Sequence, residues 1–113
     1  MIDLTGKVFI VTGGNGGIGL GMAEGIVMAG GSVVIWGRNQ EKNDAAVATL
    51  TALGGSAVAH ICDVADEAQV RETMKRSAMD FGRIDGLFAN AGRSGTGTPF
   101  LELPLAEWRA AMD

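Results

Sequence analysis

The chain has 113 residues, 47% hydrophobic and 19% charged, which suits one compact domain over residues 1–113 and excludes a disordered segment. Nine basic against 13 acidic residues give a net charge of −4, the wrong sign for a protein that binds nucleic acid over a broad surface. The single cysteine, Cys62, excludes an internal disulfide and fits a reducing, cytoplasmic environment.

The first half of the chain predicts strand, helix and strand. Val8–Val11 is a short β-branched run, typical of a strand buried on both faces. A helix follows and ends at Gly30-Gly31, and Ser32–Trp36 is the second strand. The expected apolar face of this helix has helical spacing: Ile18, Met22, Ile26 and Ala29.

The pattern then repeats. Asn39 can cap a second helix that ends at Gly54-Gly55, and strands are expected over Ala57–Cys62 and Ile84–Ala89. Between those strands, Asp66 and Gln69 have the spacing of a capping box at the start of a third helix. The inward residues expected on the two helices are Val47, Leu50 and Leu53, then Val70, Met74, Ala78 and Phe81.

Strands that alternate with helices predict right-handed crossovers and an α/β fold, a Rossmann-type doubly wound parallel sheet. A further helix is expected from Pro104, and Asp113 lies inside it with no strand after it. With strands in the order 3-2-1-4, the fourth strand is an open edge. We therefore expect a fold that is incomplete at its C-terminal side, truncated within the helix after strand four.

Glycines make up 18 of the residues and gather at 13–31 and 92–97. The first cluster begins with the run Thr12–Gly19 between strand and helix, where glycines let backbone N–H groups approach an anion at a helix N-terminus. Two registers fit this run, GxGxxG through Gly14, Gly16 and Gly19 and TGxxxGxG through Gly13, Gly17 and Gly19. Gly21 and Gly25 are expected to let the helix lie close to the sheet. The motif predicts a phosphate site.

With this motif the chain resembles the short-chain dehydrogenase/reductase family. The family fingerprint Thr-Gly-x-x-x-Gly-Ile-Gly is matched by residues 12–19, and three more family features follow in order: Asp63-Val64, Asp85 and Asn90-Ala91-Gly92. The resemblance covers the whole chain. It implies an NAD(P)-dependent oxidoreductase that transfers hydride between nicotinamide and a carbonyl or alcohol of a small-molecule substrate.

The resemblance also implies where the dinucleotide lies. The backbone of Asn15–Ile18 would hold the pyrophosphate, Asp63 and Val64 the adenine, and Asn90–Gly92 the ribose. Asp63 could instead only cap a turn, and Ala89 stands where the family often has a further asparagine. The cofactor-binding residues expected are Gly13, Asn15, Gly16, Gly17, Ile18, Gly19, Arg38, Asn39, Asp63, Val64, Asn90, Ala91 and Gly92.

Cofactor choice depends on the end of the second strand, where NAD enzymes of the family have an acid. This chain has Gly37-Arg38-Asn39 there, and a guanidinium is a bidentate partner for the 2′-phosphate of NADP. We therefore expect NADP to be preferred. In the alternative, Arg38 is a solvated loop residue and the site accepts NAD.

The family's catalytic Tyr, Lys, Ser and Asn lie downstream of these motifs, and the chain contains no tyrosine. We therefore expect no catalytic residue in residues 1–113 and no activity from them alone. One alternative is a non-catalytic NADP-binding module or sensor subunit. Another, methyl transfer from S-adenosylmethionine, lacks the acid expected near the end of the second strand.

Other binding modes are disfavoured. His60 is the only histidine and cannot make a metal site alone, so a packing role is expected for it, as for Cys62. The weakly charged stretch 8–37 is divided by glycines, and Asp3 stands where a signal peptide needs basic residues, so no membrane or targeting segment is expected. Related enzymes commonly form homo-oligomers, which we also expect of the full-length protein.

Overall fold

The computed structural model describes residues 2–90, in which strands and helices alternate along the chain. The elements are β1 (Val8–Thr12), α1 (Gly17–Met28), β2 (Ser32–Gly37), α2 (Gln40–Ala52), β3 (Ser56–Ile61), α3 (Glu67–Phe81) and β4 (Gly86–Ala89). The helix expected from Pro104, the second glycine cluster at 92–97 and the site residues Ala91 and Gly92 lie outside the described residues.

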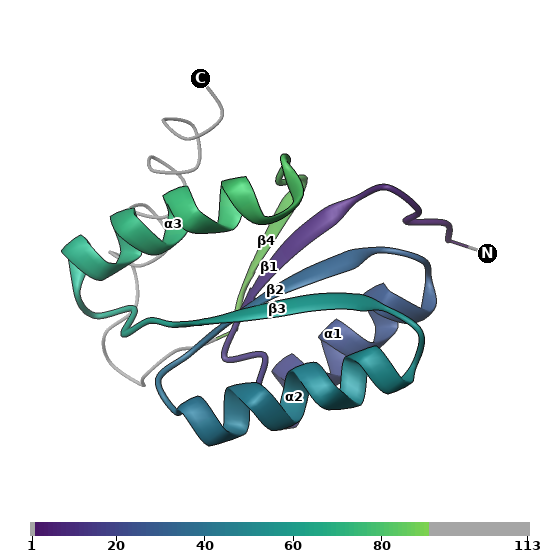
Figure 1. Ribbon diagram of the computed structural model, residues 1–113, viewed down its shortest axis with the longest axis horizontal. Coiled ribbons are helices and arrows are strands. Elements are labelled where there is room, and N and C mark those ends of the chain that lie inside the picture. Colours follow the sequence, from purple (N-terminus) through teal and green to yellow (C-terminus); the bar gives the residue numbers. More distant parts are fainter. Residues whose placement is uncertain (1, 91–113) are drawn as a thin grey trace.

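The four strands form one parallel sheet in the order β3-β2-β1-β4. The helices α1 and α2 lie on one face of it and α3 on the other (Figure 1). This arrangement confirms the predicted doubly wound α/β fold. Each parallel neighbour is reached through a crossover helix, as such pairs require.

The core is built on both faces of the two central strands. Val11, Val33 and Ile35 are fully buried in a cluster with the apolar residues of α1 and α2. The alternate residues Val34 and Trp36 belong to a second cluster, with Met74 of α3. Because successive strand residues point to opposite faces, both faces need apolar residues, which explains the unbroken apolar runs in the sequence.

The buried face of α1 differs from the prediction. Ile18 is 78% exposed, and the buried residues are Gly19, Ala23, Ile26 and Val27. The first of these buried residues is a glycine, which has no apolar side chain and so adds nothing to the hydrophobic periodicity of the sequence. The predicted face therefore began on the adjacent apolar residue, one position too early.

Two glycines of α1 do not have the role predicted for them. A Cβ atom at Gly21 or Gly25 would meet nothing within 4 Å, so neither brings the helix close to the sheet. Gly19 does so instead, as described below. On α2, Leu53 is 47% exposed although it was expected inward, because it lies after the last residue of the helix.

The second and third helices begin as predicted. The side chain of Asn39 accepts a hydrogen bond from the N–H group of Lys42, and that of Asp66 accepts from Ala68 and Gln69. Gln69 completes the box in a variant way: its Oε1 accepts the N–H of Asp63, and its Nε2 donates to Asp66. At β4, regular pairing begins at Gly86 rather than Ile84, although Ile84 is buried. No helix within residues 2–90 has the length and apolarity needed to cross a bilayer.

Candidate functional site

The loops that follow the four strands lie at one edge of the sheet. Thr12, the last residue of β1, pairs with Trp36 of β2 and with Ala89 of β4, and Trp36 pairs with His60 of β3. The strands are parallel, so the segments after them, residues 13–16, 38–39, 62–66 and 90, begin at the same edge. Ligands of such sheets bind outside the carboxyl ends of the strands.

The glycine loop, residues 13–16 between β1 and α1, turns sharply at this edge. Gly13 and Gly17 have φ angles of 67° and 55°, a region that side chains with a Cβ rarely adopt. The N–H of Gly13 donates to the carbonyl oxygen of Trp36 at 2.8 Å, which joins the start of the loop to the end of β2. The loop therefore has a defined shape in which glycine is required.

Gly19 is where α1 approaches the loop most closely. A Cβ atom on Gly19 would lie 2.2 Å from the carbonyl oxygen of Gly13 and 2.7 Å from Nδ2 of Asn90. The absence of a side chain at this position therefore lets the first turn of the helix, the loop and the end of β4 come together.

The N-terminus of α1 has no side-chain cap. Its N-cap residue is Gly16, no side-chain cap bond is made, and the first turn contains no acid. The first backbone bond joins the N–H of Leu20 to the oxygen of Gly16 at 3.2 Å, and the preceding helical N–H groups have no acceptor within residues 2–90. Unpaired N–H groups at a helix N-terminus favour an anion.

Arg38 and Asn39 follow β2 at the same edge. Arg38 is exposed and makes no hydrogen bond or ion pair with any residue from 2 to 90. Asn39 uses its side-chain oxygen to accept the N–H of Lys42 at 2.9 Å, so its predicted binding role is left to its amide nitrogen and backbone. The guanidinium of Arg38 is thus the charged group available at this position.

Asp63 lies just after β3 and begins a turn. Its Oδ1 accepts the N–H of Ala65 at 3.0 Å, so the turn-capping alternative describes a contact that is present. Its Oδ2 makes no hydrogen bond with the described residues and could still accept one from a ligand. The side chain of Val64 is half-buried against the core cluster that contains Trp36 and Met74. The contact with adenine that was predicted for Val64 would therefore be made by its backbone.

A buried asparagine that the sequence analysis did not identify joins these segments. Asn43 of α2 is 1% exposed, and its Oδ1 accepts a hydrogen bond of 2.9 Å from Nδ2 of Asn15 in the glycine loop. Its Nδ2 donates to the carbonyl oxygens of Gly37 at 3.0 Å and His60 at 3.4 Å. The available signal was a polar residue three and seven positions before the buried Ala46 and Leu50, on the apolar face of a helix.

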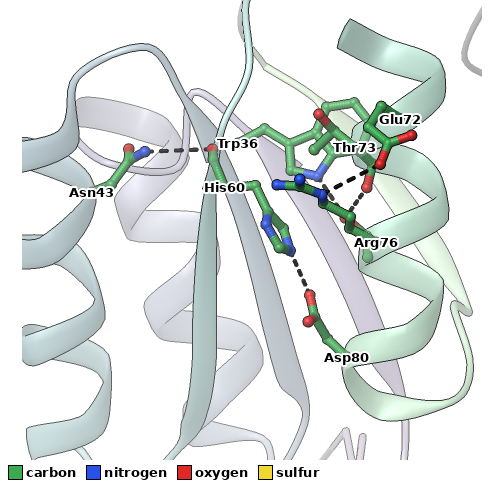
Figure 2. Close-up of polar contacts among 8 residues, drawn as sticks. Trp36, Asn43, His60, Glu72, Thr73, Arg76 and Asp80 are labelled. Carbon is green, nitrogen blue, oxygen red and sulfur yellow. Dashed lines mark hydrogen bonds and ion pairs between the residues drawn. The ribbon is translucent and has the colours of Figure 1, made fainter.

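The polar side chains near the ends of β2 and β3 contact other residues of the protein and have structural roles. Figure 2 shows Asn43 reaching the backbone of His60 from one side, while Asp80 of α3 pairs with the His60 ring at 2.6 Å from the other. Nε1 of Trp36 donates to Oγ of Ser77 at 2.9 Å. Within residues 2–90 no three His, Cys, Asp or Glu side chains gather as a metal site.

The surroundings of Cys62 and Asp85 indicate structural roles for both residues. Burial raises the pKa of the Cys62 thiol, which disfavours the reactive thiolate, as expected for a packing residue. Asp85, one of the four family features, lies before β4, where its Oδ2 accepts the N–H of Val8 at 2.8 Å. The guanidinium of Arg83, at 2.6 Å, lowers the pKa of this carboxyl. The hydrogen bond of Asp85 with Val8 links the start of β4 to the start of β1.

Comparison with known sequences identifies relatives of the whole chain. The sequence model of the family described as short chain dehydrogenase matches residues 7–113. The chain is 40% identical over 113 residues to a 2,5-dichloro-2,5-cyclohexadiene-1,4-diol dehydrogenase of Sphingobium indicum, and the match covers all of this chain and 44% of that protein. It is 35% identical over 114 residues to a 2-dehydro-3-deoxy-D-gluconate 5-dehydrogenase of Formosa agariphila, covering 43% of it. The chain thus spans less than half the length of these relatives.

Solved structures share the fold. A citronellol catabolism dehydrogenase of Pseudomonas aeruginosa PAO1 superposes with a TM-score of 0.85 at 28% identity, covering 97% of this chain and 52% of that one. A metagenomic short-chain oxidoreductase in complex with NADP gives a TM-score of 0.85 at 29% identity, covering 96% of this chain and 57% of that one.

Proposed function

Since this chain belongs to the short chain dehydrogenase family, we propose that residues 1–113 form one dinucleotide-binding domain of an oxidoreductase that prefers NADP. The whole protein would transfer hydride between nicotinamide and a carbonyl or alcohol of a small-molecule substrate. The proposed binding residues are those predicted from the sequence, with Gly19 acting through the close approach of its backbone.

The uncapped N-terminus of α1 is the observation that carries this proposal. The helix presents N–H groups without an acceptor in residues 2–90, and its N-cap residue has no side chain to cover them. A Cβ atom at Gly16 or Gly17 would meet nothing within 4 Å. Open amides, the positive end of a helix dipole and room for a ligand together suit the diphosphate of a dinucleotide.

The preference for NADP is inferred from Arg38. The guanidinium is exposed at the carboxyl edge of the sheet and is not neutralised by an ion pair within residues 2–90. The residues beside it, Gly37 and Asn39, bring no negative charge that would repel a 2′-phosphate. A structural relative bound to NADP supports the same cofactor class.

The nicotinamide cofactor supplies the hydride chemistry when it is bound. The groups of this chain would bind and orient it: the backbone of Asn15–Ile18 at the diphosphate, Arg38 at the ribose phosphate and Oδ2 of Asp63 at the adenine. Residues 1–113 contain no tyrosine, the family's acid and base. We therefore propose that they bind the cofactor but do not by themselves catalyse turnover.

Replacing Arg38 tests the cofactor preference. In Arg38→Ala, NADPH should bind about tenfold to 100-fold more weakly, as expected for losing a charge-assisted bidentate contact, while NADH affinity stays unchanged. Calorimetric titration of the full-length protein with both nucleotides measures this. Arg71→Ala, an exposed arginine on α3, is the matched control for charge. Equal losses for NADPH and NADH would contradict the assignment, and NADPH binding without turnover of any carbonyl or alcohol would favour the non-catalytic module instead.

A further inference from the structure

The glycine loop has a side-chain connection that the family motif does not contain. Asn15, in the middle of this loop, donates from Nδ2 to Oδ1 of Asn43 on α2 at 2.9 Å. Asn15 is half-buried and Asn43 is 1% exposed. The contact therefore joins a loop at the edge of the sheet to a buried group beneath it.

Asn43 is itself held in place from below. Its Nδ2 donates to the carbonyl oxygen of Gly37 at 3.0 Å and to that of His60 at 3.4 Å, at the ends of β2 and β3 (Figure 2 shows the contact with His60). With the amide nitrogen engaged by two carbonyls, the amide oxygen of Asn43 is directed to Asn15. A buried amide with both ends satisfied has one stable orientation.

Gly37 is shaped to this pair. A Cβ atom there would lie 2.3 Å from Nδ2 of Asn15 and 2.4 Å from Oδ1 of Asn43, so the hydrogen bond passes directly over the glycine. Gly37 immediately precedes Arg38. The hydrogen bond thus joins the loop proposed to hold the diphosphate to α2. It passes next to the residue that precedes Arg38, which is proposed to hold the 2′-phosphate.

We propose that Asn43 is a positioning residue for dinucleotide binding, which holds the glycine loop through Asn15 so that the amides of α1 converge on the diphosphate. This inference rests on the proposed function. Because Asn43 is 1% exposed, it would act through Asn15 and not by touching the dinucleotide. Without its oxygen, Asn15 would turn to water, residues 13–16 would gain freedom, and binding would have to order them again.

A double-mutant cycle tests the connection. The variants are Asn43→Leu, which keeps the branching of the side chain but removes its polar atoms, Asn15→Ala, and the two combined. Calorimetry on the full-length protein gives the NADPH dissociation constant of each. We expect each single variant to bind about threefold to tenfold more weakly, the effect of one neutral hydrogen bond, and the double variant to lose no more than either single one.

Ser77→Ala is the matched control. Ser77 is fully buried and bonded to Trp36 and Thr73, but it lies on α3, on the other face of the sheet. It should lower stability as a lost buried hydrogen bond does and leave NADPH affinity at the wild-type value. Adenosine 2′-monophosphate, which has no diphosphate, should bind wild type and Asn43→Leu equally.

Three results would overturn the inference. The first is wild-type NADPH affinity in the single variants, and the second is losses of affinity that add in the double variant. The third is that Asn43→Leu weakens the binding of adenosine 2′-monophosphate as much as it weakens the binding of NADPH. If Asn43→Leu fails to fold, Asn15→Ala alone decides, because its residue lies in the loop and must reproduce the loss. A wild-type protein that binds neither NADPH nor NADH would instead refute the proposed function. Binding that is present but insensitive to these variants refutes only the role of Asn43.

Discussion

The helices α1 and α3 both begin at the carboxyl edge of the sheet, but their first turns differ in chemistry. In α3, Asp66 accepts the N–H groups of Ala68 and Gln69 at 3.0 and 3.2 Å, and Glu67 adds a negative charge. In α1, Gly16 offers no side chain and the first turn has no acid. The chain thus satisfies one helix terminus from within and leaves the other open to an external anion.

Among the three helices of residues 2–90, only α1 lacks a side-chain contact at its N-cap, which lowers the stability of that helix. Because the N-cap residue of α1 is glycine, the missing side-chain contact costs the helix only about a few tenths of a kcal/mol relative to an Asn, Asp or Ser cap. The second and third helices each have such a contact, through Asn39 and Asp66. The open terminus therefore coincides with the proposed binding site, where a cap would compete with the ligand.

The largest expected effect comes from closing the space at the start of α1. Gly19→Ala places a Cβ atom 2.2 Å from the carbonyl oxygen of Gly13, so the loop or the helix must move. We expect roughly 100-fold weaker NADPH binding and a stability loss of about 1–3 kcal/mol from overpacking, measured by calorimetry and urea unfolding.

Gly21→Ala is the matched control for this substitution. It lies two residues further along the same helix, where a Cβ atom meets nothing within 4 Å. Alanine should stabilise the helix by up to about 1 kcal/mol and leave the binding of NADPH unchanged. Unaltered binding in Gly19→Ala would show that the close approach is not needed.

An intermediate effect is expected when α1 is given the cap that α3 has. Gly16→Asp fits the site, because Gly16 has extended backbone and open space around its Cβ position. The carboxylate should stabilise the helix by a few tenths of a kcal/mol and weaken NADPH binding about tenfold by charge and competition for the amides.

Gly16→Asn separates these two causes, since it can cap the helix without adding charge. Its loss of NADPH affinity should be smaller than that of Gly16→Asp. If the aspartate variant binds as tightly as the wild type, the diphosphate does not lie at this terminus.

The smallest effect concerns pH and the cap of α3. Hydrogen bonds from the backbone and side chain of Gln69 lower the pKa of Asp66 from its ordinary value of 3.8. A carboxyl whose pKa is lower in the folded state stabilises the fold fully above the unfolded value, and the contribution is lost as the pH falls through the folded value. Asp66→Asn should therefore lose less of its urea stability between pH 6 and about pH 3 than the wild type.

Asp66→Ala serves as the comparison for this measurement. It removes the cap at every pH, so its thermal midpoint at pH 7 should fall by a few degrees while NADPH affinity is unchanged. An acid-induced loss of stability in Asp66→Asn as large as that of the wild type would assign the pH dependence to other carboxyls, such as Asp85.

Local features of the sequence predicted much of this molecule. The caps at Asn39 and Asp66 join atoms two or three residues apart, and the strand of Val8–Val11 is identified by its own β-branched side chains. The glycine run 12–19 predicted a turn followed by the N-terminus of a helix, because glycines are themselves visible in a sequence. Such features depend on residues that are neighbours in the chain, so the local sequence is sufficient to predict them.

The sequence by itself determined the order of strands and helices, the capped helices and the position of the glycine loop. Only the tertiary structure decided that Asn15 meets Asn43 across 28 positions and that α1 packs through Gly19 while Ile18 is exposed. These contacts depend on how separate elements are placed around the sheet. Glycine has no apolar side chain, and asparagine occurs both buried and exposed. Neither residue type therefore indicates in the sequence which distant residue it will contact.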